Sequence, residues 1–130
     1  MPGRRGYGWR WRRHSGRMVR FLDPVLLLLL HRGRAHGYTL LERLAEFGLG
    51  DLDPSVIYRA LRDMEEMGWV ASTWDEEQTR GPPRRVYRLT AEGAHALAQW
   101  VQDLEETRGL VDRFLAAYQQ HITEDKGEHH

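Results

Sequence analysis

The chain contains no cysteine among its 130 residues. Disulfide bonds and thiolate metal sites are therefore excluded, and the composition suits a reducing compartment. No segment is arranged as a secretory signal, because the basic residues at the start are not followed directly by an apolar run and a small-residue cleavage site. We therefore expect a cytoplasmic protein.

Long apolar runs are also missing. The run VLLLLL at residues 25–30 is bounded by Asp23 and His31, and it is far shorter than the roughly 20 residues that a membrane-spanning helix needs. We expect this run to form a buried core helix, and we expect the protein to have no membrane partner.

Motifs of catalysis are absent too. The sequence has no nucleophile elbow, no phosphate-binding glycine loop and no histidine–carboxylate arrangement, and the acidic residues 75–77 are only neighbours in a polar loop. The histidines, His36 and His95 among them, lack the spacing of metal ligands. We predict that the protein is not an enzyme and that it uses neither a metal nor another cofactor.

Charge is balanced in total but not along the chain. The 19 basic and 19 acidic residues give a formal net charge of zero. Residues 1–37 contain nine arginines and one acid, Asp23, whereas residues 38–130 contain ten basic residues and 18 acids, so the two parts carry +8 and −8. Any binding of an anion must therefore be local, through the N-terminal arm or through a few arginines on an acidic body.

Helix start and stop signals divide the first half of the chain into three helices. A cap and proline pair at Asp23-Pro24 opens the first helix, which should end near Arg32, and residues 38–47 show the helical spacing of the second. Another such pair, Asp53-Pro54, opens the third helix, which Gly68 should end.

Two strands and a long helix follow. Residues 69–74 and 85–89 read as the strands of a hairpin around a polar loop, and Thr90 should cap the last helix. Apolar residues in this helix keep a 4-3 heptad spacing, which predicts pairing with other helices. Part of this apolar stripe should pack on the chain's own first helix, and the rest should pair with a second copy of the chain. The predicted dimerisation residues are Leu97, Val101, Leu104, Val111, Leu115 and Tyr118.

This order of elements predicts a mainly α fold with a small β-hairpin, a winged helix-turn-helix plus a long C-terminal dimerisation helix. In this fold the third helix enters a DNA groove, and the hairpin, called the wing, reaches an adjacent phosphate or groove. We expect a basic, disordered arm at residues 1–20, the DNA-binding domain at 21–92, the dimerisation helix at 93–122 and a frayed tail at 123–130.

Several segments of the sequence resemble the PadR-like family of transcriptional regulators. They are HGYTL at 36–40, PSVIYRAL at 54–61, EEMGWV at 65–70 and GPPRRVYRLTAEG at 81–93, of which the last is the most specific. The long last helix resembles that of the short-tailed members. The resemblance implies a homodimeric repressor that binds a pseudo-palindromic operator in double-stranded DNA and is often released by a small effector.

Residues on two helices are candidates for DNA contact. On the third helix they are Ser55, Tyr58, Arg59 and Arg62, which fall opposite or beside its apolar face. The alternative is a solvated face whose arginines pair with neighbouring acids. Tyr38 and Thr39 begin the second helix, where Thr39 could contact a phosphate or could equally be a plain helix cap.

The wing supplies the arginines Arg80, Arg84 and Arg85, whose guanidinium groups suit phosphates and narrow minor grooves. Two prolines stiffen the loop, and we expect Tyr87 and Leu89 to face the core. The alternative is a solubilising hairpin, because the acids of residues 75–77 could neutralise the arginines locally.

Two further features leave alternatives open. The arm carries seven arginines and two tryptophans in 20 residues, which fits contact with nucleic acid but also an unstructured tail of nonspecific affinity. The resemblance suggests a small aromatic effector near Trp100, with Phe21 and Phe114 as weaker candidates, although plain packing would also explain Trp100. The alternative to a regulator is a winged-helix module that binds protein and no specific DNA.

Overall fold

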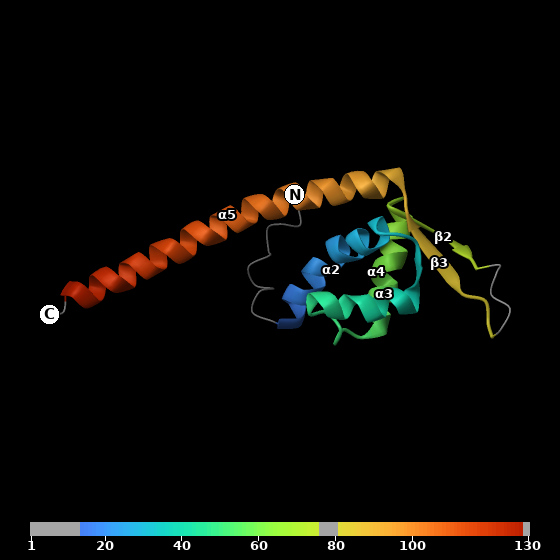
Figure 1. Ribbon diagram of the computed structural model, residues 1–130, viewed down its shortest axis with the longest axis horizontal. Helices are drawn as coiled ribbons and strands as arrows, with labels where there is room; N and C mark the ends of the chain where they lie inside the picture. The colour runs from blue at the N-terminus through green and yellow to red at the C-terminus, as the bar shows by residue number, and fades with distance from the viewer. Residues whose placement is uncertain (1–13, 76–80, 129–130) are drawn as a thin grey trace. The chain divides into compact units, whose positions relative to one another are not determined.

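The computed structural model describes residues 14–75 and 81–128 (Figure 1). The chain forms two units, residues 1–97 and 98–130. The first unit contains the helices α2 (His14–His31), α3 (Gly37–Arg43) and α4 (Pro54–Glu66), the short 3-10 helix η2 (Leu44–Phe47), and the strands β1 (Ala35–His36), β2 (Val70–Trp74) and β3 (Arg85–Leu89). The helix α5 (Ala91–Glu128) begins in the first unit and makes up the described part of the second.

The first helix begins earlier than we predicted. It starts at His14 and contains Pro24, so the predicted start at Asp23-Pro24 is wrong. Leu22, one turn before Leu26 on the same face, is 1% exposed. A proline inside a helix removes one backbone hydrogen bond, and the buried leucines on both sides of Pro24 offset this loss through packing. Residues 14–20 of the predicted arm thus belong to α2, while residues 1–13 lie outside the described part of the chain.

The second and third helices lie close to their predicted positions. The second is divided into α3 and η2, and Gly48 ends it with a left-handed φ of 75°. The third begins as predicted, because the Asp53 side chain accepts a hydrogen bond of 2.9 Å from the backbone N–H of Ser55. This cap satisfies one of the helix's unpaired N–H groups.

The sheet has three antiparallel strands in the order β1-β3-β2. In the register of β2 and β3, Ser72 is opposite Tyr87 and Trp74 is opposite Arg85. The strand β1 was missed, because we placed residues 35–36 in a loop; Ala35 pairs with Tyr87 in the structure. Two residues carry too short a pattern to indicate a strand, and only their pairing with β3 makes them one.

The core of the first unit is built from one face of each helix and the inner residues of the sheet. Its fully buried side chains include Leu22, Leu26, Leu27, Leu29, Leu40, Leu44, Ile57, Leu61, Met64 and Val70. The run at residues 25–30 is thus a core helix, as predicted. Among the described residues, no helix has the length and apolar character that a membrane span requires.

A tight junction joins β3 to α5. Thr90 caps the helix as predicted: its hydroxyl accepts a hydrogen bond from the backbone N–H of Gly93 (3.0 Å) and donates one to the Gly68 carbonyl oxygen (2.6 Å). A side chain at position 93 would overlap the carbonyl oxygen of Trp69, so only glycine fits there. The motif at residues 81–93 therefore ends in a glycine for a steric reason.

The second unit is a helix with many exposed apolar side chains. Leu110, Phe114 and Tyr118 are 60%, 66% and 52% exposed. The helix continues to Glu128, beyond the end that we predicted at residue 122, so residues 123–128 are helical.

Candidate nucleic-acid interface

The helix α4 separates an apolar face from a polar face. Its apolar residues Ile57, Leu61 and Met64 are buried. The four residues that we predicted to contact DNA, Ser55, Tyr58, Arg59 and Arg62, are all exposed, and the Tyr58 side chain is 41% exposed. The structure therefore leaves this face of the helix open to a partner.

The start of α3 presents one exposed aromatic residue. Tyr38 is 45% exposed and Thr39 is half-buried. The helix begins at Gly37, with His36 in the capping position. Thr39 lies inside the first turn, so the interpretation of Thr39 as the helix cap is wrong, while its contact with a phosphate stays a prediction.

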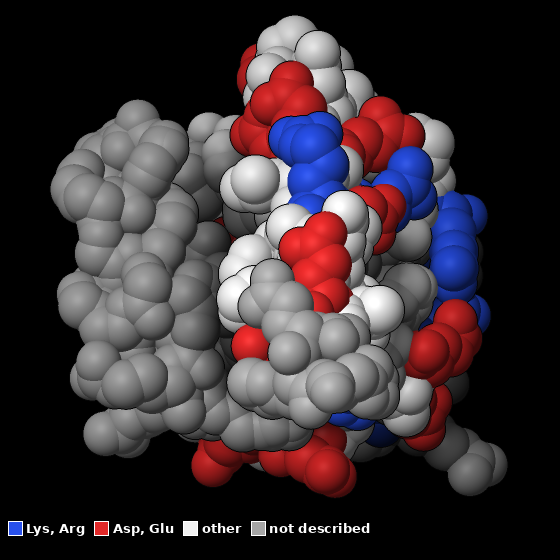
Figure 2. All heavy atoms as spheres, turned by 90° about the vertical axis from the view of Figure 1, so that its left-hand side faces the viewer, with Lys and Arg blue, Asp and Glu red and all other residues white. Residues whose placement is uncertain are grey.

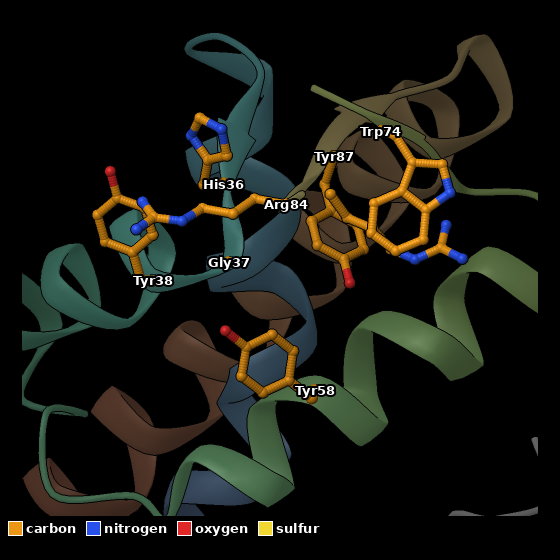
Figure 3. A pocket seen from close by; sticks show the side chains of 8 residues that line it. His36, Gly37, Tyr38, Tyr58, Trp74, Arg84 and Tyr87 are labelled. Atoms are coloured by element: carbon orange, nitrogen blue, oxygen red, sulfur yellow. The ribbon is translucent and has the colours of Figure 1, made fainter. Parts of the chain in front are cut away.

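These elements surround one cavity of about 550 Å³, which we call the wing-base cavity (Figure 3). Its lining comes from β1, α3, α4 and the hairpin of β2 and β3: His36, Gly37, Tyr38, Tyr58, Trp74, Arg84, Arg85 and Tyr87. Four of the predicted DNA-contact residues, Tyr38, Tyr58, Arg84 and Arg85, thus meet at one place although they are far apart in the sequence.

Both wing arginines of the cavity lie against aromatic rings. The Arg84 Cζ atom is 4.7 Å from the centroid of the Tyr38 ring, and the Arg85 Cζ atom is 4.6 Å from that of Trp74. A cation over a ring face is held by the ring's quadrupole and keeps its charge. Among the described residues, neither guanidinium group forms an ion pair with a carboxylate.

Asp75, one of the three acids that the alternative interpretation set against the wing arginines, lies against His36. Asp75 Oδ2 is 2.8 Å from His36 Nε2, and both side chains are largely buried. The His36 ring also stacks on Tyr38, with 5.6 Å between the centroids. This pair ties the end of β2 to the start of α3. Residues 76 and 77 lie outside the described part of the chain.

Tyr58 packs tightly on the backbone at Gly37. A Cβ atom at this position would be 2.6 Å from Tyr58 Cε1 and 2.8 Å from its hydroxyl oxygen. Figure 3 shows the Tyr58 hydroxyl group pointing from α4 toward Gly37. The glycine of the HGYTL segment therefore makes room for the tyrosine of the PSVIYRAL segment.

Tyr87 is a third tyrosine in the lining of the cavity. Its side chain is 8% exposed, which confirms that this residue faces inward. Burial raises its pKa, against a smaller lowering by the charge of Arg85. The hydroxyl group therefore stays protonated at neutral pH and can donate a hydrogen bond.

The prediction from sequence missed four residues that line the cavity: His36, Gly37, Trp74 and Tyr87. Trp74 is 55% exposed at the end of β2, opposite Arg85. An aromatic residue near a basic hairpin is a signal for such a pair, but only the strand register shows which arginine it meets.

The other predicted residues are dispersed. Arg80 lies outside the described residues. Phe21 and Phe114 are 41% and 66% exposed, and Trp100 is half-buried. Of the predicted dimerisation residues, Leu97 is 9% exposed and belongs to the core of the first unit, and Leu104 is half-buried. The remaining four are exposed on α5: Val101, Val111, Leu115 and Tyr118.

The distribution of charged side chains is consistent with an anion-binding site that is confined to a few residues. On the face shown in Figure 2, the described Asp and Glu side chains are interspersed with Lys and Arg. Together with the −8 charge of residues 38–130, this mixture means that an anion must be attracted by particular arginines.

The sequence and the fold match known proteins. The model of the transcriptional regulator PadR-like family matches residues 25–99. A PadR family transcription regulator from Clostridium difficile has 26% identity and a TM-score of 0.66, covering 73% of this chain and 98% of that chain. One from Eggerthella lenta has 31% identity and a TM-score of 0.64, covering 75% and 80%.

A third solved structure is that of Bacillus subtilis PadR in complex with operator DNA. It has 24% identity and a TM-score of 0.55 and covers 62% of this chain and 46% of that chain, a likeness that extends to the fold alone. No curated protein sequence matches the chain.

Proposed function

The chain belongs to the transcriptional regulator PadR-like family, and on this basis we propose that it acts as a homodimeric repressor that binds operator DNA. The helix α4 would enter the major groove of each half-site, with Ser55, Tyr58, Arg59 and Arg62 toward the DNA. Tyr38 and Thr39 would meet the backbone, and Arg84, Arg85 and Arg80 of the wing would hold the flanking phosphates or minor groove.

One observation carries this proposal. Tyr58 on the exposed face of α4, Tyr38 at the start of α3 and the wing arginines Arg84 and Arg85 all line the wing-base cavity, where both guanidinium groups lie against aromatic rings. Bacillus subtilis PadR, which shares the fold, is bound to operator DNA. The two arginines form a local basic site on an otherwise acidic chain, and the aromatic rings beside them are uncharged. Such a site favours binding of a polyanion, such as a DNA backbone, at this one place.

The second unit supports the dimeric part of the proposal. Val101, Val111, Leu115 and Tyr118 follow the heptad spacing and are about half exposed. An apolar stripe of this length on a single helix requires a partner. A second copy of α5 would cover it and set the distance between the two α4 helices, which must match half-sites separated by about one turn of DNA.

The test is a titration of labelled DNA from upstream of the protein's own gene, at several salt concentrations. We expect tight, sequence-selective binding. The slope of log affinity against log salt concentration, which we call the salt slope, should fall by the equivalent of about one phosphate contact in Arg84→Ala and in Arg85→Ala. Arg88→Ala is the matched control, because Arg88 is also exposed on β3 but does not line the cavity.

The proposal fails if binding is weak and indifferent to sequence, as a module for protein interaction would show. It also fails in part if Arg88→Ala lowers the slope as much as the two other substitutions, because general charge would then explain the binding. Analytical ultracentrifugation of the full chain tests the dimer, which Leu115→Asp should dissociate.

The last part of the proposal is a small-molecule effector. Trp100 is half-buried on α5, and Phe21 and Phe114 are exposed, so each ring is available to a planar ligand. Planar aromatic compounds should quench the tryptophan fluorescence, and Trp100→Ala should remove most of the response. An unchanged response in this variant would contradict a role for Trp100 in effector binding.

A further inference from the structure

Arg85 is held in place by three residues that have no assigned part in DNA binding. Trp74 lies directly opposite Arg85 in the sheet, and its ring centroid is 4.6 Å from Arg85 Cζ. Opposite residues of two antiparallel strands project from the same face. The contact therefore follows from the strand register, and Figure 3 shows the indole beside the wing-base cavity.

A chain of hydrogen bonds connects the same guanidinium group to α4. Arg85 Nη1 donates to Ser72 Oγ over 2.8 Å, and Ser72 Oγ donates to Glu65 Oε2 over 2.8 Å. The serine hydroxyl acts as donor and acceptor at once, so both bonds form together. A wing arginine is thereby linked, through β2, to the helix that we propose enters the major groove.

These contacts orient Arg85 without neutralising it. The indole is uncharged, and Glu65, the acid at the end of this chain of hydrogen bonds, is separated from Arg85 by the serine hydroxyl. A free arginine side chain on a hairpin would lose rotamer freedom on binding a phosphate, and preorganisation removes part of that loss. Because Trp74 is 55% exposed, its ring contributes little to the core.

We propose that Trp74, with the Ser72–Glu65 chain, positions Arg85 for a DNA phosphate and couples the wing to α4. This inference rests on the proposed function. Trp74 is a positioning residue: it acts through Arg85 and its loss should leave the fold intact. Removing an exposed cation–π contact should lower operator affinity about two- to fivefold.

The first measurement needs no DNA. In the free protein, the Nε–Hε proton resonance of Arg85 should be shifted upfield by the indole ring, and Trp74→Ala should remove the shift. Trp74→Phe should keep part of it, because a smaller ring remains under the cation. An Arg85 resonance that is the same in the wild type and in Trp74→Ala overturns the inference, whatever the protein binds.

The second measurement is a double-mutant cycle on operator affinity and salt slope. Trp74→Ala should cost about two- to fivefold in the wild type and in Arg84→Ala, and nothing further in Arg85→Ala. Ser72→Ala should give a loss of similar size that also vanishes in Arg85→Ala. An equal loss with and without Arg85 overturns the inference.

A matched control separates this effect from general loss of an aromatic contact. Phe47→Ala removes another exposed ring that lies under a cation, 5.8 Å from Arg32 Cζ and outside the cavity lining. It should leave operator affinity unchanged. Wild-type protein without selective DNA binding would refute the proposed function, and the resonance of Arg85 in the free protein would then show whether its orientation failed as well.

Discussion

Replacing Asp23 with asparagine should make the protein more stable at neutral pH. Asp23 is half-buried inside α2, not at its start, and its carboxyl group lies near Asp63 of α4. Burial, with a smaller contribution from the charge of Asp63, raises the pKa of Asp23 from 3.8 to about 6. At neutral pH the native protein must therefore keep a carboxylate ionised in an unfavourable place.

The size of this effect follows from the linkage between protonation and folding. The pKa of Asp23 is higher in the native state than in the unfolded state, so the unfolded state binds fewer protons between pH 3.8 and about 6, and stability falls as the pH rises through this window. The difference between these two pKa values corresponds to a loss of about 3 kcal/mol in the free energy of unfolding at neutral pH. Because the amide is also polar and half-buried, we expect Asp23→Asn to recover about 2 kcal/mol at pH 7.5.

The assay is urea unfolding followed by circular dichroism, at pH 4 and at pH 7.5. The protein concentration must be equal in all experiments, because the stability of a dimer depends on it. The gain from Asp23→Asn should be present at pH 7.5 and nearly absent at pH 4, where the native carboxyl group is already protonated. Asp63→Asn, which removes only the repulsion, should give a smaller gain with the same pH dependence.

A particular result would refute this reasoning. If Asp23→Asn changed the free energy of unfolding equally at both pH values, the carboxylate charge would not be the cause. If the variant were less stable at pH 7.5, the Asp23 carboxylate would be making a favourable contact that outweighs its burial.

Three other substitutions test how the site is built. Gly93→Ala should destabilise the protein by about 3 kcal/mol or more in urea unfolding, because the new methyl group meets the rigid Trp69 carbonyl oxygen; an Ala variant of normal stability would contradict the packing. Gly37→Ala should displace Tyr58 and weaken operator binding about tenfold, and the substitution should add no loss to Tyr58→Ala. Asp53→Ala should lower the melting temperature, because the α4 cap is lost. The hydrogen bond from Ser55 also holds the pKa of Asp53 below its usual value, so in the wild type this stabilisation should disappear as the pH falls through that lowered pKa, and the variant should lack this dependence.

The order and type of the elements were predictable where the signal is local. Asp53-Pro54 marks the start of α4, and Thr90 marks the start of α5, because each cap satisfies backbone groups of its own helix. The alternation in residues 85–89 indicated that Tyr87 faces inward, and the structure confirms it. These features depend on neighbours within about four positions in the chain.

The same local rule misplaced the first helix. Asp23-Pro24 carries the pattern of a start, yet α2 passes through it, because Leu22 and Leu26 are buried together on one face. A capping preference is worth about 1 kcal/mol, whereas burying one large apolar side chain contributes about 1.5–3 kcal/mol. The contribution of burial is larger than that of capping, so the helix continues through the start signal.

By itself, the sequence determined a winged helix with a long last helix, and it supplied the arginines that we propose contact DNA and the glycines that the tight contacts need. Only the tertiary structure decided which charges remain available. Asp75 faces His36, and the two wing arginines lie on Tyr38 and Trp74. Partners of this kind are chosen by strand register and helix packing between residues far apart in the chain, and no pattern within a single segment specifies them.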